Sequence, residues 1–247
     1  MVKLERLPAP EYLSAEKVKE LTAEFKQKKT SVWNHAAIKD QLLASSYQKC
    51  AYCESRLDEE SKFMEVEHFE DKDTYKDKVV EWANLLPSCK RCNGAKGTHD
   101  VIQEPIVNPY LHEPKAHLFL RAYRFRSKSQ LGASTVDVLD LNNSARVVLR
   151  RFDIGEAIIR AVSVARDRHL QWVAKPSTRA RNLLFGAVDG LLLECQRESE
   201  YSATAATILH DEPFYLELIR DMKVSGLWTL EFEMLHVKSA ELVLHPE

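Results

Sequence analysis

Two pairs of cysteines at the same short spacing constrain this chain more than any other feature. Cys50 and Cys53 form one CxxC pair, Cys89 and Cys92 form a second, and Cys195 lies alone in an apolar stretch. Each CxxC turn presents two thiolates, and two such turns complete a tetrahedron around zinc at about 2.3 Å per bond. Four thiolates leave no open coordination position, so we expect a structural Zn²⁺, with Cys195 as a small buried hydrophobe.

Composition bounds the class of protein. The 247 residues suffice for one large domain or two small ones, and a hydrophobic content of 45% supports a real core. No apolar run reaches about 18 residues, and the opening MVKLERLPAP lacks an apolar signal core. We therefore expect a cytoplasmic protein with no membrane association.

Charge is distributed unevenly along the chain. Residues 115–181 carry fourteen Lys and Arg against five Asp and Glu, whereas residues 182–247 carry four against twelve. A basic stretch can follow a phosphate backbone and an acidic one would repel it, although both also suit ordinary solvated faces. We take residues 182–247 as a candidate docking surface, with a plain solvated helical cap as the alternative.

The hydrophobic pattern predicts an α+β chain that is mostly helical. Helices are expected over 14–29, with Ser14 as N-cap, and over 35–48. Alternation predicts a strand over 62–69, and residues 79–88 fit a short strand and turn that lead to the second cysteine pair.

The later part of the chain has a different pattern. Strands are expected over 117–126 and 134–141, on either side of Gly132. From Asn143 the chain is expected to be mainly helical, with a first helix to 175 that is interrupted at Gly155. The other expected helices are 177–198 and one from about Pro213, whereas 226–237 suits either strand or helix.

A second set of polar residues surrounds the cysteines. Glu67 and His68 are adjacent on the predicted strand, so their side chains point to opposite sides or splay at its end. One of them could bind a metal while the other activates water. Close to the second cysteine pair lie Asn84, Asn93, Lys96 and His99. Each residue alone suits a surface strand, a cap or a solvated side chain, and only their order and spacing indicate chemistry.

That order resembles the HNH endonucleases across about residues 47–100. The motifs that carry the resemblance are CAYCE, Glu67-His68, NLLPSCKRCN and Lys96-Gly97. The resemblance implies a zinc-stapled ββα-metal (His-Me finger) core that hydrolyses phosphodiester bonds. This chain departs from many members in three places: Glu67 replaces Asp, Asn93 replaces a final His, and Asp71-Lys72 replaces Pro-Lys.

The resemblance also implies a role for each polar residue. His68 would be the general base that takes the proton of water, with Glu67 and Asn93 holding a catalytic Mg²⁺ or Mn²⁺ through oxygen ligands. Asn84 would hold the strand-turn geometry or orient His68. Lys96 would contact a substrate phosphate, and His99 is a further candidate metal ligand.

A wider resemblance, over about residues 30–155, is to the PtuB group. It adds VNPY and STVDVLDLNNSARVVLRR to the motifs above. That group supplies the nuclease subunit of Septu anti-phage systems and of some retron-linked modules. The resemblance therefore implies a PtuA-like ATPase of ABC or SMC type as partner, and in retron versions a reverse transcriptase with its msDNA. This chain has no GxxxxGK[ST] loop of its own.

Three hypotheses about function remain open at this point. The chain is a metal-dependent nuclease that cuts DNA, a nuclease of the same chemistry that cuts RNA such as tRNA, or a non-catalytic zinc module that binds nucleic acid. The polar set around the cysteines favours the first two, because a purely structural zinc site does not require it. We expect an N-terminal helical segment (1–46), an HNH core (47–110) and a mainly helical region (111–247) that docks a partner.

Overall fold

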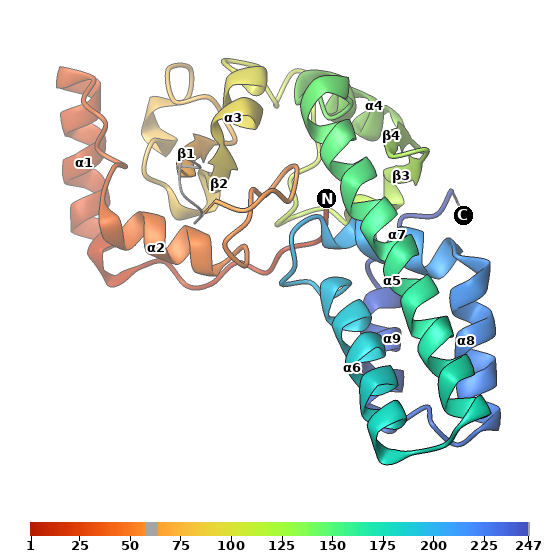
Figure 1. The fold of residues 1–247 in the computed structure, drawn as a ribbon. Helices are drawn as coiled ribbons and strands as arrows, with labels where there is room; N and C mark the ends of the chain where they lie inside the picture. The colour runs from red at the N-terminus through yellow and green to blue at the C-terminus, as the bar shows by residue number, and fades with distance from the viewer. Residues whose placement is uncertain (58–63, 247) are drawn as a thin grey trace. The chain divides into compact units, whose positions relative to one another are not determined.

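The computed structural model describes residues 1–57 and 64–246. They form two units, one of residues 1–118 and 126–142, the other of residues 119–125 and those from 143 onward. The predicted segments 1–46 and 47–110 both lie in the first unit. The division of the chain into three functional parts remains a prediction. The helices and strands (Figure 1) are α1 (Ala15–Lys28), α2 (Ala36–Ala44), β1 (Met64–His68), β2 (Leu85–Cys89), α3 (Lys90–Lys96), β3 (Leu118–Arg121), β4 (Arg124–Ser127), α4 (Gln130–Val138), α5 (Leu149–Ala174), α6 (Thr178–Glu194), α7 (Ser202–Asp211), α8 (Pro213–Val224) and α9 (Leu230–Ala240).

The two N-terminal helices share a hydrophobic core with the strands that follow. The predicted cap of α1 is confirmed, because the Ser14 side chain accepts a hydrogen bond from the Lys17 amide. Phe25 of α1 and Ile38 of α2 are buried against Val66 of β1. The N-terminal helices therefore support the strand that carries the candidate catalytic residues.

Strands β1 and β2 form an antiparallel pair in which Met64 lies opposite Cys89 and His68 opposite Leu85. Both strands were predicted, although residues 62–63 of the expected 62–69 lie outside the described part of the chain. Helix α3 follows β2 without a gap. The order of two strands and one helix is that of the expected ββα core.

The prediction of a strand at 134–141 was wrong, because these residues belong largely to α4. The Ser129 side chain caps this helix by accepting a hydrogen bond from the Gly132 amide. A Cβ on Gly132 would lie 2.1 Å from the His117 carbonyl oxygen, so this position needs glycine for a close backbone approach. The predicted 117–126 strand is instead the paired strands β3 and β4.

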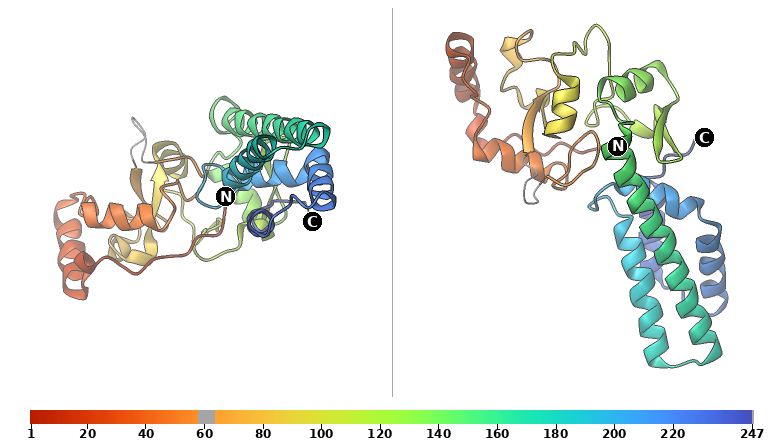
Figure 2. Two further views of the ribbon diagram at one scale, coloured as in Figure 1. Left: turned by 60° about the horizontal axis from the view of Figure 1, so that its bottom comes forward. Right: turned by 45° about the horizontal axis from the view of Figure 1, so that its top comes forward.

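The second unit is helical. Helix α5 packs on α6, α7 and α8, and α6 packs on α9; Figure 2 shows α5 and α6 side by side. The expected interruption at Gly155 was wrong, since α5 runs through it. Gly155 is required there by packing, because a Cβ would lie 2.5 Å from the Tyr123 ring.

The last two helices and Cys195 also lie in the second unit. Helix α8 begins at Pro213 as predicted, and α9 shows that the ambiguous 226–237 stretch is largely helical. Cys195 is fully buried, as expected for a small hydrophobe. In the described part of the chain, no helix is both long enough and apolar enough to cross a membrane.

Candidate active site and metal centre

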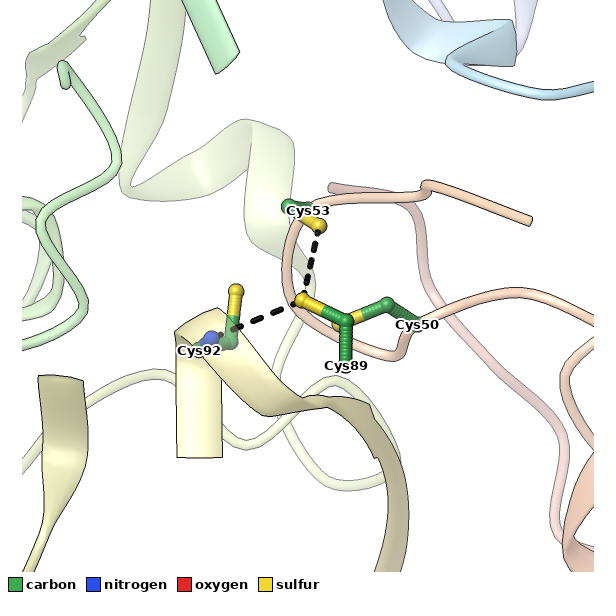
Figure 3. Close-up of side chains that lie close together, drawn as sticks. All are labelled: Cys50, Cys53, Cys89 and Cys92. Carbon is green, nitrogen blue, oxygen red and sulfur yellow. Dashed lines mark hydrogen bonds between the residues drawn. The ribbon is translucent and has the colours of Figure 1, made fainter. Parts of the chain in front are cut away.

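The two CxxC pairs meet in the first unit as predicted. The sulfur atoms of Cys50, Cys53, Cys89 and Cys92 all lie within 4.8 Å of one another, and their side chains converge in Figure 3. The Cys53 and Cys89 sulfurs are 3.7 Å apart, close to the about 3.8 Å expected for tetrahedral bonds of about 2.3 Å. The four cysteines thus form a cluster that could hold zinc.

The surroundings of the cluster also suit a metal. Burial raises the pKa of the Cys50 thiol, so a thiolate there needs a cation beside it. The Arg91 guanidinium lies 2.9 Å from the Cys92 sulfur and donates to the carbonyl oxygens of Leu139 and Asp140. Arg91 therefore provides positive charge beside the cluster and joins it to the turn after α4.

Helix α3 carries two of the predicted site residues toward β1. Cys89 is its N-cap, and the Cys89 sulfur accepts a hydrogen bond from the Cys92 amide. Asn93 and Lys96 lie one turn apart on the helix, so they share a face. Asn93 Nδ2 donates to Glu65 Oε2 at 2.6 Å.

Lys96 forms a buried ion pair with Glu67. Its ammonium lies 2.8 Å from Glu67 Oε1 and donates to the His68 carbonyl oxygen at 2.9 Å. The two residues are only 3% and 2% exposed. Burial raises the pKa of Glu67 to about 7, whereas Lys96 acts to lower it. Apart from Lys96, Glu67 has no ion-pair or hydrogen-bond partner among the residues that the structure describes.

His68 points to the other side of β1, as the alternation of a strand predicts. Its Nε2–H donates to the Val79 carbonyl oxygen at 2.9 Å, because a carbonyl can only accept. The Trp33 ring meets the imidazole edge-on, with centroids 4.6 Å apart. Burial lowers the pKa of His68 to about 4. The ring is therefore neutral at pH 7, and Nδ1 is the nitrogen left to accept a proton.

Asn84 holds the loop that provides the Val79 carbonyl. Its amide group accepts from the Glu70 amide and donates to the carbonyl oxygens of Glu70 and Lys78. The Asn84 carbonyl oxygen accepts from the Phe69 amide, next to His68. Asn84 therefore closes the loop between β1 and β2 at both ends, which fits the predicted role in strand-turn geometry.

Arg6 in turn supports the turn that contains Asn84. Its guanidinium donates to the carbonyl oxygens of Trp82, Ala83 and Leu85. It also lies 3.9 Å from the centroid of the Tyr110 ring. This arginine connects the N-terminal segment to the site.

Several of the side chains near β1 and α3 line a hollow of about 410 Å³. Its lining comes from the segment before α2, from β1 and the loop after it, and from α3. The lining residues are Ser31, Trp33, Asn34, Lys39, Met64, Glu65, Val66, Glu67, His68, Asp71, Lys72, Asn93 and Gly97. The three carboxylates and two amides of this lining give an oxygen donor set that suits a hard divalent cation.

Comparison with known proteins agrees with this geometry. The family model of the HNH endonucleases matches residues 50–99. The Septu protein PtuB of Bacillus thuringiensis is 44% identical over 239 residues, which cover 95% of this chain and 92% of that protein. The chain belongs to the PtuB family of HNH endonucleases. As a member of the PtuB family it is a nuclease, and its substrate is a nucleic acid.

Within this PtuB-family fold, the predicted site residues are not all in one place. Glu67, His68 and Asn93 line the hollow. His99 lies beside Glu104, with its Nε2 2.8 Å from the Glu104 carbonyl oxygen. Its role as a metal ligand stays a prediction. Lys96 is buried under Glu67 rather than exposed, a position that does not favour the predicted contact with substrate phosphate.

The sequence reasoning missed several residues of the site. Glu65 had a signal, because strand alternation places it on the same face as Glu67, two residues away. Arg6, Trp33 and Lys39 had none, because they lie outside the matched HNH region and reach the site only through the tertiary fold.

Proposed function

We propose that the chain hydrolyses DNA phosphodiester bonds with one divalent ion, Mg²⁺ or Mn²⁺, held by Glu67 and Asn93. The free oxygen of Glu67 and the Asn93 amide oxygen are the ligands, with Glu65 orienting Asn93 through the 2.6 Å hydrogen bond. Such an ion polarises the phosphate and stabilises the leaving 3′ oxygen. Lys96 holds Glu67 in place through the other carboxylate oxygen.

His68 acts as the general base in this proposal. The observation that carries the proposal is the hydrogen bond from His68 Nε2 to the Val79 carbonyl oxygen, which fixes the tautomer. Nδ1 then takes a proton from water, which attacks the phosphorus atom. Asn84 acts indirectly, because it holds the loop that presents Val79.

The test is His68→Ala, assayed with plasmid DNA and with total RNA in Mg²⁺ and in EDTA. Loss of a general base costs about 10²–10⁴-fold in rate. We expect cleavage of DNA to fall by that factor while zinc content stays unchanged. Cleavage at the parent rate would remove His68 from the mechanism. The chemistry acts on a phosphate that DNA and RNA share, so parallel cleavage of RNA would instead support the RNA-cutting hypothesis.

We further propose that the nuclease works in an anti-phage defence complex with an ABC- or SMC-type ATPase. The similarity to a Septu protein supports this role. We place the docking surface on residues 182–247, where α8 and α9 expose several large apolar side chains. These side chains are Phe214, Leu216, Val224, Leu230, Met234 and Val237. Copurification with any ATPase found to be encoded beside the gene, and cleavage in its presence, test the complex. A reverse transcriptase gene there would indicate the retron version.

A further inference from the structure

One wall of the hollow comes from residues outside the matched HNH region. Trp33 and Asn34 precede α2, and Lys39 lies within it. Trp33 contacts the His68 ring. A substrate that reaches His68 must therefore lie along this N-terminal wall as well as along β1 and α3.

The carboxylates that line the hollow are already engaged. Glu65 accepts from Asn93, and Glu67 pairs with Lys96. Asp71 Oδ2 accepts hydrogen bonds from the backbone and side chain of Thr74. Each of these carboxylates therefore has a partner other than Lys39.

Lys39 differs from the other cations of this region. Lys72 lies 3.7 Å from an Asp73 oxygen, and its ammonium is 5.8 Å from the centroid of the Trp33 ring. Lys96 is buried in its ion pair. Lys39 is half-buried and lines the hollow. Over residues 1–57 and 64–246 its ammonium has neither a carboxylate at ion-pairing distance nor a hydrogen-bond partner.

We propose that Lys39 binds a backbone phosphate of the nucleic acid, next to the phosphate that is cut. A lysine ammonium is a compact point charge, which suits a phosphate oxygen and carries no sequence information. The ligand is thus the phosphodiester backbone of DNA or RNA. The proposal rests on the proposed function only because His68 marks the position of the phosphate that is cut. It also assigns the N-terminal segment to the substrate surface.

Lys19 offers a matched control. It is exposed on α1 and does not line the hollow, and its ammonium has no ion pair or hydrogen bond within the described residues. Lys39→Gln and Lys19→Gln remove the same charge from the same unit. Any difference between them reports the position of the lysine and not the net charge of the protein.

The first measurement is binding of the zinc-loaded full chain, carrying His68→Ala to prevent cleavage, to a fluorescein-labelled DNA duplex over a KCl series. Each phosphate contact with B-DNA contributes about 0.9 to the slope of log K against log salt. We expect Lys39→Gln to reduce that slope by about 0.9 and Lys19→Gln to leave it unchanged. A labelled single-stranded RNA, for which the contribution is about 0.7, tests the second backbone.

The second measurement uses chains with His68 intact. A contact made equally in the ground state and the transition state changes KM and leaves kcat unchanged. We expect Lys39→Gln to raise KM about tenfold at unchanged kcat, and Lys39→Arg to restore most of the loss. Equal salt slopes for the Lys39 and Lys19 variants would overturn the proposal. Failure of the His68→Ala chain without a further substitution to bind the DNA or the RNA would also overturn it. Cleavage by His68→Ala at the parent rate would overturn the catalytic assignment alone.

Discussion

The buried pair of Lys96 and Glu67 makes a quantitative prediction about the stability of the site. Lys96→Met removes the ammonium but keeps a side chain of similar length. Glu67 then stays 2% exposed without the partner that lies 2.8 Å away. Removing one member of a buried ion pair costs about 3–5 kcal/mol when the other charge stays buried and unpaired. The cost is smaller at a pH where Glu67, whose pKa burial already raises to about 7, takes up a proton, so the comparison is made above pH 7. The hydrogen bond to the His68 carbonyl oxygen is lost as well.

A double substitution tests whether the cost arises from that unpaired charge. Glu67→Gln removes the charge that needs a partner, so the double variant should lie closer to the parent than Lys96→Met does. We expect a coupling free energy of about 2–3 kcal/mol in the cycle. Lys90→Met is the matched control, since Lys90 is exposed on the same helix. It should change the free energy of unfolding by no more than about 0.5 kcal/mol.

Hydrogen–deuterium exchange of the zinc-loaded chain measures this cost locally. Peptides from β1 and α3 report the pair, and peptides from α5 and α6 are the internal reference. A loss of 3 kcal/mol raises the opening equilibrium roughly a hundredfold, because about 1.4 kcal/mol corresponds to a factor of ten. Exchange in the Lys96→Met chain within a factor of about two of the parent would refute the reasoning. A double variant less stable than Lys96→Met alone would also refute it.

Three other predictions follow. Cys89→Ser should reduce bound zinc to well below one ion per chain, measured by elemental analysis, and should lower solubility because it removes one of four ligands. Arg6→Lys removes the guanidinium that donates to three carbonyl oxygens around Asn84. The free energy of unfolding of the first unit should fall by about 1.5–3 kcal/mol, and the cleavage rate should fall with it. An unchanged cleavage rate would show that Arg6 does not support the site. Burial lowers the pKa of His210 to about 4 in the folded chain, below its usual value of about 6.5. Between pH 4 and 6.5 the unfolded chain therefore binds more protons than the folded chain, so the stability that His210 contributes should be lost as the pH falls through this range. In urea titrations at several pH values, His210→Gln should make the free energy of unfolding depend less on pH.

Much of the site could be predicted from the sequence because its signals are local. A CxxC turn, an alternating strand and a capped helix each depend on a few neighbouring residues. The cluster of four cysteines and β1 were accordingly found, and Glu67 and His68 have different partners. Whether these residues perform the chemistry remains a prediction.

The failures have a different physical origin. Gly132 and Gly155 looked like breaks between elements, but each lies within a helix where a Cβ would collide with another segment. Close approach of distant segments leaves no local pattern in a sequence. Arg6 and Lys39 were missed for the same reason, since their partners or surroundings lie on other segments of the chain.

Cys89 joins the cysteine cluster to the candidate catalytic residues. Cys89 ends β2, pairs with Met64 at the start of β1, and caps α3. The cysteine cluster therefore sets where α3 begins, and α3 places Asn93 against Glu65 and Lys96 against Glu67. A helix of seven residues is too short to hold its own position in water, because isolated helices are marginal below about 12–15 residues. Loss of zinc should therefore release α3 from β1 and separate the carboxylates from their partners, while the apolar core between the N-terminal helices and the strands remains to hold His68.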